Sequence, residues 1–255
     1  MSQLISTADT TMGSVSVPTR IYRTALPSSW TIVFAHGGGF SWGTLDDYDL
    51  IARRLCSATG AEVISVDYRL APDYPFPCGL DDLCQVLREI GRERMVAVAG
   101  DSAGGCLAAS AAQFVQAEGL IRLDAQILIY PMIEHYDRTP DGFHTLAGRF
   151  HPSFEAIRGA WDNYLQAPVS ALPTYAVPPR GPSLIGLPPT LTIVAENDPL
   201  RFEGIAYAEL LAAAGVASSV LSYEGTEHGF LNEPSQQSVP AAMRDIGTWL
   251  ADVKP

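Results

Sequence analysis

The sequence predicts an α/β protein in which a mostly parallel central sheet carries helices on both faces. Short apolar runs alternate with longer segments of helical periodicity, and the short runs are apolar at consecutive positions. Continuous apolar runs are typical of parallel strands, because helices cover both faces of such a sheet. The predicted strands are residues 31–35, 62–66, 95–99, 125–130, 190–195 and 219–223, and the predicted helices are residues 46–58, 80–90, 103–117, 203–214 and 239–253.

Each element rests on a local pattern. Residues 13–23 alternate valine and isoleucine with polar residues, which predicts antiparallel strands at an edge of the sheet. The central strands, such as TIVFA at 31–35 and MVAVA at 95–99, are short, apolar and bounded by polar or glycine-containing segments. In the segments between strands, apolar residues recur three and four positions apart, as on one face of a helix.

One interval breaks this alternation. Residues 133–187 contain no predicted strand, but they hold three histidines, several aromatic residues and a proline-rich end. The spacing of Phe154, Ile157, Trp161 and Tyr164 predicts a short amphipathic helix there. Because long insertions in compact domains are usually functional, we expect a cap over the carboxyl edge of the sheet. The alternative is a structural excursion remote from any site.

Composition limits the class of protein. The 255 residues suit a single domain spanning 1–255, with 47% hydrophobic and 17% charged residues. A net charge of -12 argues against nucleic-acid binding. The chain has no apolar run long enough for a membrane span and no secretory signal pattern at its start. Four cysteines without a Cys-x-x-Cys pair predict reduced thiols, and we expect a cytoplasmic protein.

The segment Gly100-Asp101-Ser102-Ala103-Gly104 lies between a predicted strand and a predicted helix. A strand, a sharp turn with one serine and a helix together expose the serine hydroxyl for attack on a carbonyl. The glycines allow the strand and helix to approach closely. Ser102 is therefore the candidate nucleophile.

A serine nucleophile needs a base, and the base needs an orienting acid. His228 follows the last predicted strand and precedes a glycine, which favours it as the base over a structural histidine. Asp198, in the turn before Pro199, is the first candidate acid. Glu196 is the second, and Glu203 at the start of the next helix is a third; each could instead be a solvated loop charge or a helix cap.

The loop His36-Gly37-Gly38-Gly39-Phe40 directly follows the strand 31–35. Its exposed amides, with the amide of Ala103, would stabilise the oxyanion formed by attack on a carbonyl. Such loops also bind phosphate, but no nucleotide-binding pattern is present. Histidines and cysteines do not fall at metal-ligand spacings, so we expect neither a metal nor another cofactor.

The sequence resembles the hormone-sensitive-lipase-like family (bacterial family IV) of α/β-hydrolase carboxylesterases, over nearly the whole chain from about Thr31. The resemblance rests on five ordered blocks, which are residues 36–40 (HGGGF), 67–72 (DYRLAP), 100–105 (GDSAGG), 186–190 (GLPPT) with 198–201 (DPLR), and 223–225 (YEG) with 228–230 (HGF).

The resemblance implies the α/β-hydrolase fold and a role for each site residue. Ser102 would be the nucleophile, Asp198 the orienting acid and His228 the general base. The oxyanion donors would be Gly38, Gly39 and Ala103. The implied pocket-lining residues are Phe40, Trp42, Trp161 and Tyr164, and the residues implied to brace the glycine loop are His36, Asp67, Tyr68 and Arg69.

The chain departs from the family pattern in three places. The amino-terminal cap segment is short, within residues 1–25, which implies a more open site. Asp73 stands where Glu is common, and Cys106 stands where Asn is usual. We read Cys106 as a small buried residue.

The expected activity is therefore that of a serine carboxylesterase acting on small-molecule esters with short acyl chains. An amide, formamide or lactone hydrolase with the same triad is the alternative, and a non-catalytic ligand receptor is a third. A homodimer formed through the last helix and strand is left open.

Overall fold

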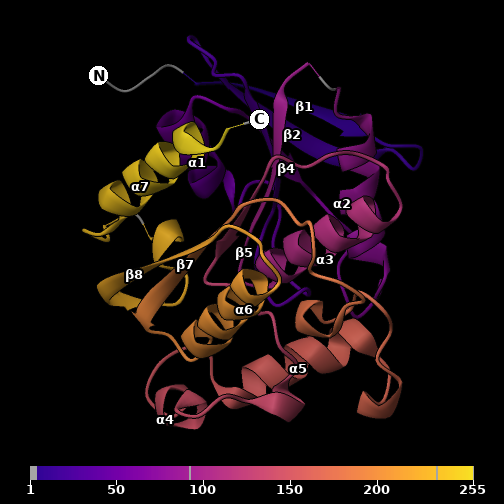
Figure 1. Cartoon of the computed structure of the whole chain (residues 1–255), viewed down its shortest axis with the longest axis vertical. Helices are drawn as coiled ribbons and strands as arrows, with labels where there is room; N and C mark the ends of the chain where they lie inside the picture. Colours follow the sequence, from indigo (N-terminus) through magenta and orange to yellow (C-terminus); the bar gives the residue numbers. More distant parts are fainter. Residues whose placement is uncertain (1–4, 92, 234, 255) are drawn as a thin grey trace.

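An eight-stranded sheet runs through the computed structural model, which describes residues 5–91, 93–233 and 235–254 (Figure 1). The strand order is β1-β2-β4-β3-β5-β6-β7-β8. Strand β2 is antiparallel to β1 and β4, and all other neighbours are parallel. The strands are β1 Ile5–Met12, β2 Val17–Thr24, β3 Trp30–Ala35, β4 Glu62–Val66, β5 Met95–Asp101, β6 Ala125–Ile129, β7 Thr190–Asn197 and β8 Ser218–Glu227. The predicted mostly parallel α/β sheet is confirmed.

Helices cover both faces of this sheet (Figure 1). Helices α1 (Asp49–Thr59) and α7 (Val239–Asp252) pack on one face. Helices α2 (Cys78–Glu89), α3 (Ala103–Ala117) and α6 (Arg201–Ala213) pack on the other. All five predicted helices are present; α3 has the predicted bounds, and the ends of the other four lie within a few residues of those expected.

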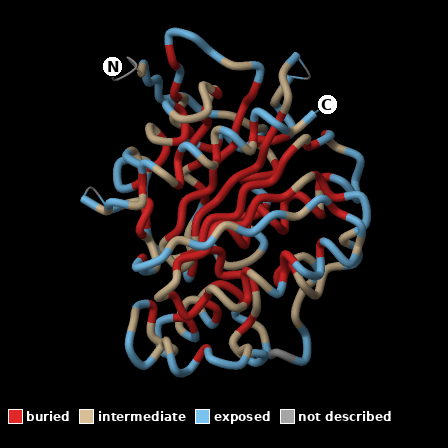
Figure 2. The backbone as a smooth tube through the Cα atoms, turned by 60° about the vertical axis from the view of Figure 1, so that its left-hand side comes forward, coloured by how far each residue is buried: buried red, intermediate tan, exposed pale blue. Residues whose placement is uncertain are grey.

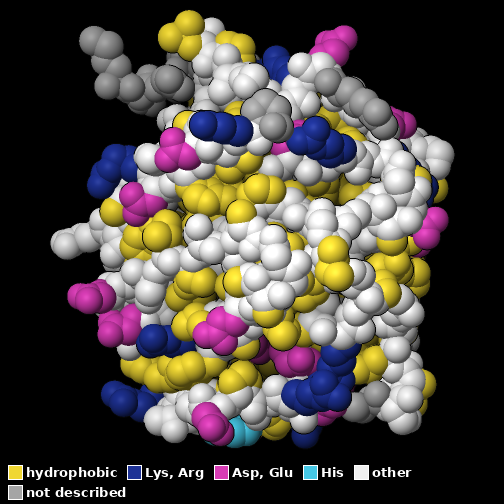
Figure 3. Space-filling model, in the orientation of Figure 1, with side chains coloured by type: hydrophobic (Ala, Val, Ile, Leu, Met, Phe, Trp, Pro, Cys, Tyr) yellow, Lys and Arg dark blue, Asp and Glu magenta, His cyan; other side chains and the backbone are white. Residues whose placement is uncertain are grey.

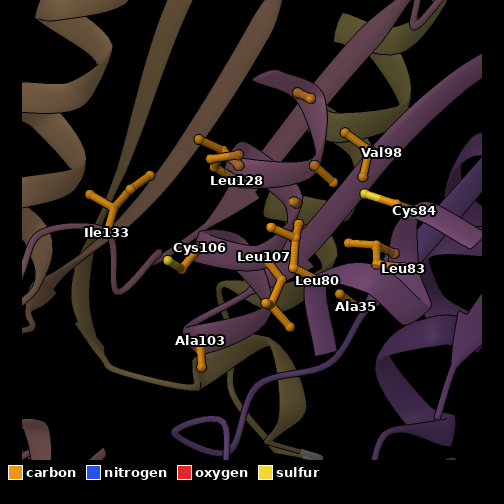
Figure 4. Close-up of a cluster of buried hydrophobic side chains, with 14 of the residues drawn as sticks. Ala35, Leu80, Leu83, Cys84, Val98, Ala103, Cys106, Leu107, Leu128 and Ile133 are labelled. Carbon is orange, nitrogen blue, oxygen red and sulfur yellow. The ribbon is translucent and has the colours of Figure 1, made fainter. Parts of the chain in front are cut away.

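The core has one cluster on each face of the sheet. In β3, Val33 and Ala35 face the cluster under α2 and α3, whereas Ile32 and Phe34 face the cluster under α1 and α7. Figure 2 shows the buried strands at the centre, and Figure 4 shows Leu107 of α3 close to Leu80 and Leu83 of α2. Burial on both faces explains why the central strands are apolar at consecutive positions.

The first strands correct one expectation. Strands β1 and β2 pair antiparallel from Ile5↔Thr24 to Met12↔Val17, and β2 also pairs with β4. Strand β2 falls largely in the segment 13–23 whose alternating pattern predicts an edge strand, and β1 extends the edge further. Residues 5–24 therefore belong to the sheet and do not form a shortened cap segment. Residues 1–4 of the expected segment lie outside the described part of the chain.

The interval 133–187 lies at the end of the sheet that holds the carboxyl ends of the parallel strands (Figure 1). It contains α4 (Phe143–Ala147), α5 (Phe154–Leu165) and three short 3₁₀ helices, which are η1 (Tyr136–Arg138), η2 (Val169–Ala171) and η3 (Pro178–Arg180). Helix α5 begins after Ser153, whose hydroxyl accepts the amide of Ala156 at 3.2 Å. This helix is the predicted amphipathic one.

Both ends of the interval 133–187, named the cap below after the role that we expect for it, are fixed to the body of the protein. At its start, the buried carboxylate of Glu203 in α6 accepts the amide of Ile133 at 2.6 Å. Near its end, the Gln113 side chain of α3 donates to the carbonyl of Pro178 at 2.9 Å. Arg180 joins the two ends, because its guanidinium lies 2.6 Å from the carboxylate of Glu134.

Charged side chains of both signs are dispersed over the surface. On the face in Figure 3, Lys and Arg side chains lie at scattered positions, several of them beside acidic ones. No helix in the described part of the chain is long and apolar enough to cross a membrane.

Candidate active site

Ser102 occupies a sharp turn between β5 and α3. Its φ is 53° and its ψ is -119°, a conformation that non-glycine residues rarely adopt. Its amide donates to the carbonyl of Ile129 at 2.9 Å, and its carbonyl accepts the amide of Met132 at 3.0 Å. Neighbouring β6 and the start of the cap therefore hold the turn in place.

Two glycines make this turn sterically feasible. A Cβ on Gly100 would lie 2.0 Å from the carbonyl oxygen of Gly104. A Cβ on Gly104 would lie 2.1 Å from the carbonyl oxygen of Ala35 in β3. The local sequence therefore needs glycine at both positions to bring helix, strand and oxyanion loop together.

The structure brings the predicted triad together. Nε2 of His228 lies 2.9 Å from Oγ of Ser102. Nδ1 of His228 lies 2.7 Å from Oδ2 of Asp198. Asp198 follows β7 and His228 follows β8, so both side chains reach Ser102 from the carboxyl ends of parallel strands. This is the hydrogen-bonded order that a nucleophile, its base and an orienting acid require.

The geometry also separates the three candidate acids. Asp198 is fully buried, and its second oxygen, Oδ1, accepts the amide of Leu200 at 2.9 Å. The carboxylate of Glu196 instead accepts the amide of Gly225 at 2.7 Å. Glu203 bonds to the start of the cap at the amide of Ile133. Only Asp198 among these three faces the imidazole.

Electrostatics favour the protonated imidazole. Burial acts to lower the pKa of His228, but the charge of Asp198, its hydrogen bond and the charge of Asp101 outweigh burial and raise it. Burial raises the pKa of Asp101 to about 7, against the charge of His228 and a hydrogen bond from Gly37. The imidazolium formed when Ser102 loses its proton is thus stabilised from two sides.

The side chain of Asp101 holds the start of the glycine loop in place. The amide of Gly37 donates to Oδ1 of Asp101 at 2.8 Å. Gly38 and Gly39 have φ values of 96° and 59°, and their amides have no acceptor among the described residues. Ala103 is the first residue of α3, so its amide has no partner within the helix. Three unpaired amides thus belong to the segments that flank the nucleophile.

Aromatic packing braces the same loop. The ring of His36 stacks between Tyr48 and Tyr68, at 4.9 and 4.4 Å between ring centres. The Tyr68 hydroxyl donates to the carbonyl of His36 at 2.8 Å. Burial lowers the pKa of His36 to about 4, so it is neutral at pH 7. These contacts fit the bracing roles that the resemblance implies for His36 and Tyr68.

The other two residues of that block make different contacts. The amide of Asp67 donates to the carbonyl of Pro18 in β2 at 3.0 Å. The Arg69 side chain pairs with Asp82 of α2 at 2.8 Å. Asp67 and Arg69 therefore anchor the block 67–72 to β2 and α2. Of these three residues, only Tyr68 forms a hydrogen bond to the glycine loop.

A pocket of about 410 Å³ opens onto the triad. Its lining comes from the oxyanion loop and the start of α1 (Gly38, Gly39, Trp42, Tyr48), the nucleophile turn (Asp101, Ser102, Met132), the cap (His151, Pro152, Ala156, Ile157, Ala160) and the segment after β8 (His228, Gly229, Asn232, Glu233). Such a volume fits a small molecule.

The lining differs from expectation at three positions. Trp42 lines the pocket and is 59% exposed. Phe40, Trp161 and Tyr164 are buried and do not line it. Phe40 stacks on Tyr164 at 3.9 Å and packs against Trp161 at 5.3 Å between ring centres, so these rings join the cap to the core.

Other residues line the pocket on the cap side, and none of them was predicted from the sequence to line it. On α5 these are Ala156, Ile157 and Ala160, whose small or branched side chains leave space beside Ser102. The spacing of the two alanines, one helical turn apart, is the signal available in the sequence. The polar members His151 and Asn232 carry no comparable pattern.

No cluster of His, Cys, Asp or Glu in the described ranges could hold a metal ion. The four cysteines are free thiols; Cys56, Cys84 and Cys106 are buried, and Cys78 is partly so. Burial raises the pKa of Cys106, consistent with a packed side chain rather than a reactive thiolate.

Comparison with known proteins gives concordant matches. The family model described as "alpha/beta hydrolase fold" matches residues 32–232. Carboxylesterase NlhH of Mycobacterium tuberculosis is 37% identical over 270 residues, covering 95% of this chain and 79% of that protein. Ethyl acetate hydrolase of Pseudomonas putida is 31% identical, covering 87% of this chain and 74% of its own.

A solved structure agrees in three dimensions. An esterase from Pyrobaculum calidifontis superposes with a TM-score of 0.88 at 33% identity, covering 98% of this chain and 87% of that one. With the strand order and the serine turn described above, these matches show that the chain belongs to the α/β hydrolase fold family.

Proposed function

We propose that this esterase hydrolyses small carboxylic esters with short acyl chains through an acyl-enzyme on Ser102, without a cofactor. The observation that carries the proposal is the hydrogen-bonded sequence from Asp198 through His228 to Ser102, at 2.7 and 2.9 Å. It lies beside the unpaired amides of the glycine loop. The relatives named as carboxylesterases and esterases support the same reaction class.

The proposed mechanism follows from these positions. Ser102 attacks the ester carbonyl while His228 takes its proton at Nε2, and Asp198 holds the imidazole by its Nδ1–H. The oxyanion binds the amides of Gly38, Gly39 and Ala103. His228 then protonates the departing alcohol. Water, deprotonated by His228, attacks the acyl group, and Ser102 leaves with the returned proton.

Pocket size supports a short acyl chain. The cavity of about 410 Å³ must hold both the acyl and the alcohol parts of the substrate. It is closed on one side by α5, through Ile157 and Ala160. The name of the Pseudomonas putida relative, an ethyl acetate hydrolase, is consistent with a small ester.

The test combines a variant with a chain-length series. Ser102→Ala should keep the wild-type unfolding transition and lower kcat for p-nitrophenyl acetate by about 10⁴-fold or more. A fluorophosphonate probe should label the wild type at Ser102 only. Turnover unchanged in Ser102→Ala would reject the mechanism, and a rate maximum at long acyl lengths would reject the short-chain preference.

Two further expectations belong to this proposal. We propose a cytoplasmic enzyme and pairing of two copies through α7 and β8. Strand β8 is the last in the sheet order, and Val220 in it is 40% exposed. Cell fractionation and light scattering of the purified protein test these two points.

A further inference from the structure

We propose that the alcohol side of the pocket selects alcohols that carry a positive charge, with Glu233 as the specificity-determining residue. This inference rests on the proposed esterase function. It concerns the part of the pocket formed by Trp42, Tyr48, Asn232 and Glu233, here called the α1–η4 compartment.

The compartment is built from two segments that pack together. Tyr48 immediately precedes α1, and Asn232 ends the 3₁₀ turn η4 (Phe230–Asn232). Arg54 of α1 donates to the carbonyls of Leu231 and Glu233, at 2.6 and 3.2 Å. Residues far apart in the sequence therefore form one wall.

The position of His228 assigns this wall to the alcohol. His228 must protonate the departing alcohol oxygen, so the alcohol lies on the imidazole side of Ser102. Asn232 and Glu233 follow His228 by four and five residues in the same turn, and all three line the pocket. The apolar residues Ile157 and Ala160 line the pocket from α5 of the cap instead.

Two polar groups in this wall have no hydrogen-bond partner among the described residues. Oδ1 of Asn232 is buried and accepts no hydrogen bond from the described residues. Tyr48 is 5% exposed and lines the pocket, and no hydrogen bond of its hydroxyl is found in the described ranges. Unpartnered buried polar atoms are rare in folded proteins, so a ligand that donates a hydrogen bond would satisfy Oδ1 of Asn232.

Charge distinguishes a cationic ligand from a neutral one. The described lining contains the exposed carboxylate of Glu233 and no Lys or Arg. Asp101 also lines the pocket, but burial raises its pKa to about 7 and its Oδ1 accepts the amide of Gly37. Burial and the charge of His228 lower the pKa of His151, which favours the neutral form of this cap residue. The exposed indole of Trp42 offers a π face that attracts cations. Carboxylate, carbonyl oxygen and indole are together complementary to an ammonium group.

The test compares an ammonium ester with its neutral isostere. The substrates are 2-(dimethylamino)ethyl acetate, protonated at pH 7, and 3-methylbutyl acetate, which has the same shape without the charge. Each kcat/KM is divided by the rate constant for hydroxide hydrolysis of that ester, which removes differences in intrinsic reactivity. Glycerol monoacetate is the third substrate and represents neutral polyols.

We expect the wild type to prefer the ammonium ester by roughly three- to tenfold at low salt. Glu233→Gln should abolish most of this preference, and Glu233→Lys should reverse it. Glu209→Gln is the matched control, because Glu209 is exposed on α6 outside the pocket and its loss changes the net charge equally. This control should keep the wild-type preference.

Three outcomes would overturn the inference. One is the absence of a charge preference in the wild type, and another is an equal loss of preference in Glu209→Gln and Glu233→Gln. The third is a larger normalised rate for glycerol monoacetate than for the ammonium ester. Hydrolysis of 3-methylbutyl acetate without charge discrimination would reject this inference alone, whereas failure to hydrolyse any ester, p-nitrophenyl acetate included, would reject the proposed function as well.

Discussion

Replacing Asp198 by asparagine tests the orientation of the base most directly. Oδ1 of Asp198 accepts the amide of Leu200 at 2.9 Å, and Oδ2 faces Nδ1 of His228 at 2.7 Å. In Asp198→Asn, the amide oxygen must stay on the Leu200 side, because an NH₂ group there would meet another donor. The NH₂ group then faces Nδ1, which must accept its hydrogen. The neutral imidazole therefore carries its proton on Nε2 and cannot take the proton of Ser102.

The expected loss is about 10⁴-fold in kcat, or about 5.5 kcal/mol of transition-state stabilisation. A second readout is the pH profile. The charge of Asp198 and its hydrogen bond raise the pKa of His228 against the opposing effect of burial. Activity rises as His228 loses its proton, so the residual activity of the variant should reach half its maximum at lower pH than the wild type.

The assay is steady-state hydrolysis of p-nitrophenyl acetate between pH 5 and 9, with thermal unfolding as a check on the fold. Glu196→Gln is the matched control, because it makes the same chemical change near the end of the same strand and keeps an oxygen for the amide of Gly225. It should change kcat by less than about twofold. Retention of a tenth or more of kcat in Asp198→Asn, or an equal loss in Glu196→Gln, would refute the reasoning.

Three other substitutions test the surroundings of the site. Burial raises the pKa of Asp101 to about 7, so the folded state keeps a proton that the unfolded chain releases near pH 4. The free energy of unfolding of the wild type should therefore fall by a few kcal/mol as the pH rises from about 4 to about 7. Urea unfolding of Asp101→Asn should not show this fall. In Gly37→Ala the new Cβ would lie 2.7 Å from Oδ2 of Asp101, which should displace the oxyanion loop and lower kcat by about 10²–10³-fold; an unchanged kcat would show that this anchor is dispensable. Trp161→Ala should lower the free energy of unfolding by about 3–5 kcal/mol in urea titrations, whereas a loss below about 1 kcal/mol would argue against a core role.

The sequence predicted the parts of the fold that depend on local patterns. Helix α3 has the predicted bounds, because its alanine-rich stretch follows directly on the serine turn. Strand β1 was not predicted from residue 5, because its residues ISTADTTM have no apolar alternation and are largely exposed. It forms because β2 offers a partner along its whole length. Pairing of this kind is not encoded in the pattern of one strand.

The site shows the same division. The triad could be predicted because its chemistry requires particular residue types after particular strands, and the structure brings Ser102, Asp198 and His228 within hydrogen-bonding distance. The residues that line the pocket could not be predicted in this way. Trp161 and Tyr164 recur at helical spacing, and that spacing describes the buried face of α5, where large rings gain most from leaving water. The open space comes from the small residues beside them.

The cap is fastened at both ends, by Glu203 to the helix that follows the acid turn and by Gln113 to the helix that begins at the nucleophile. Opening of the whole cap as a flap would break both attachments. It would also leave the buried carboxylate of Glu203 without the amide hydrogen bond from Ile133. The ring of Tyr164 in α5 also stacks on Phe40 of the oxyanion loop, which holds the middle of the cap. We therefore expect substrate to enter past rim side chains such as the indole of Trp42, with turnover that depends little on solvent viscosity.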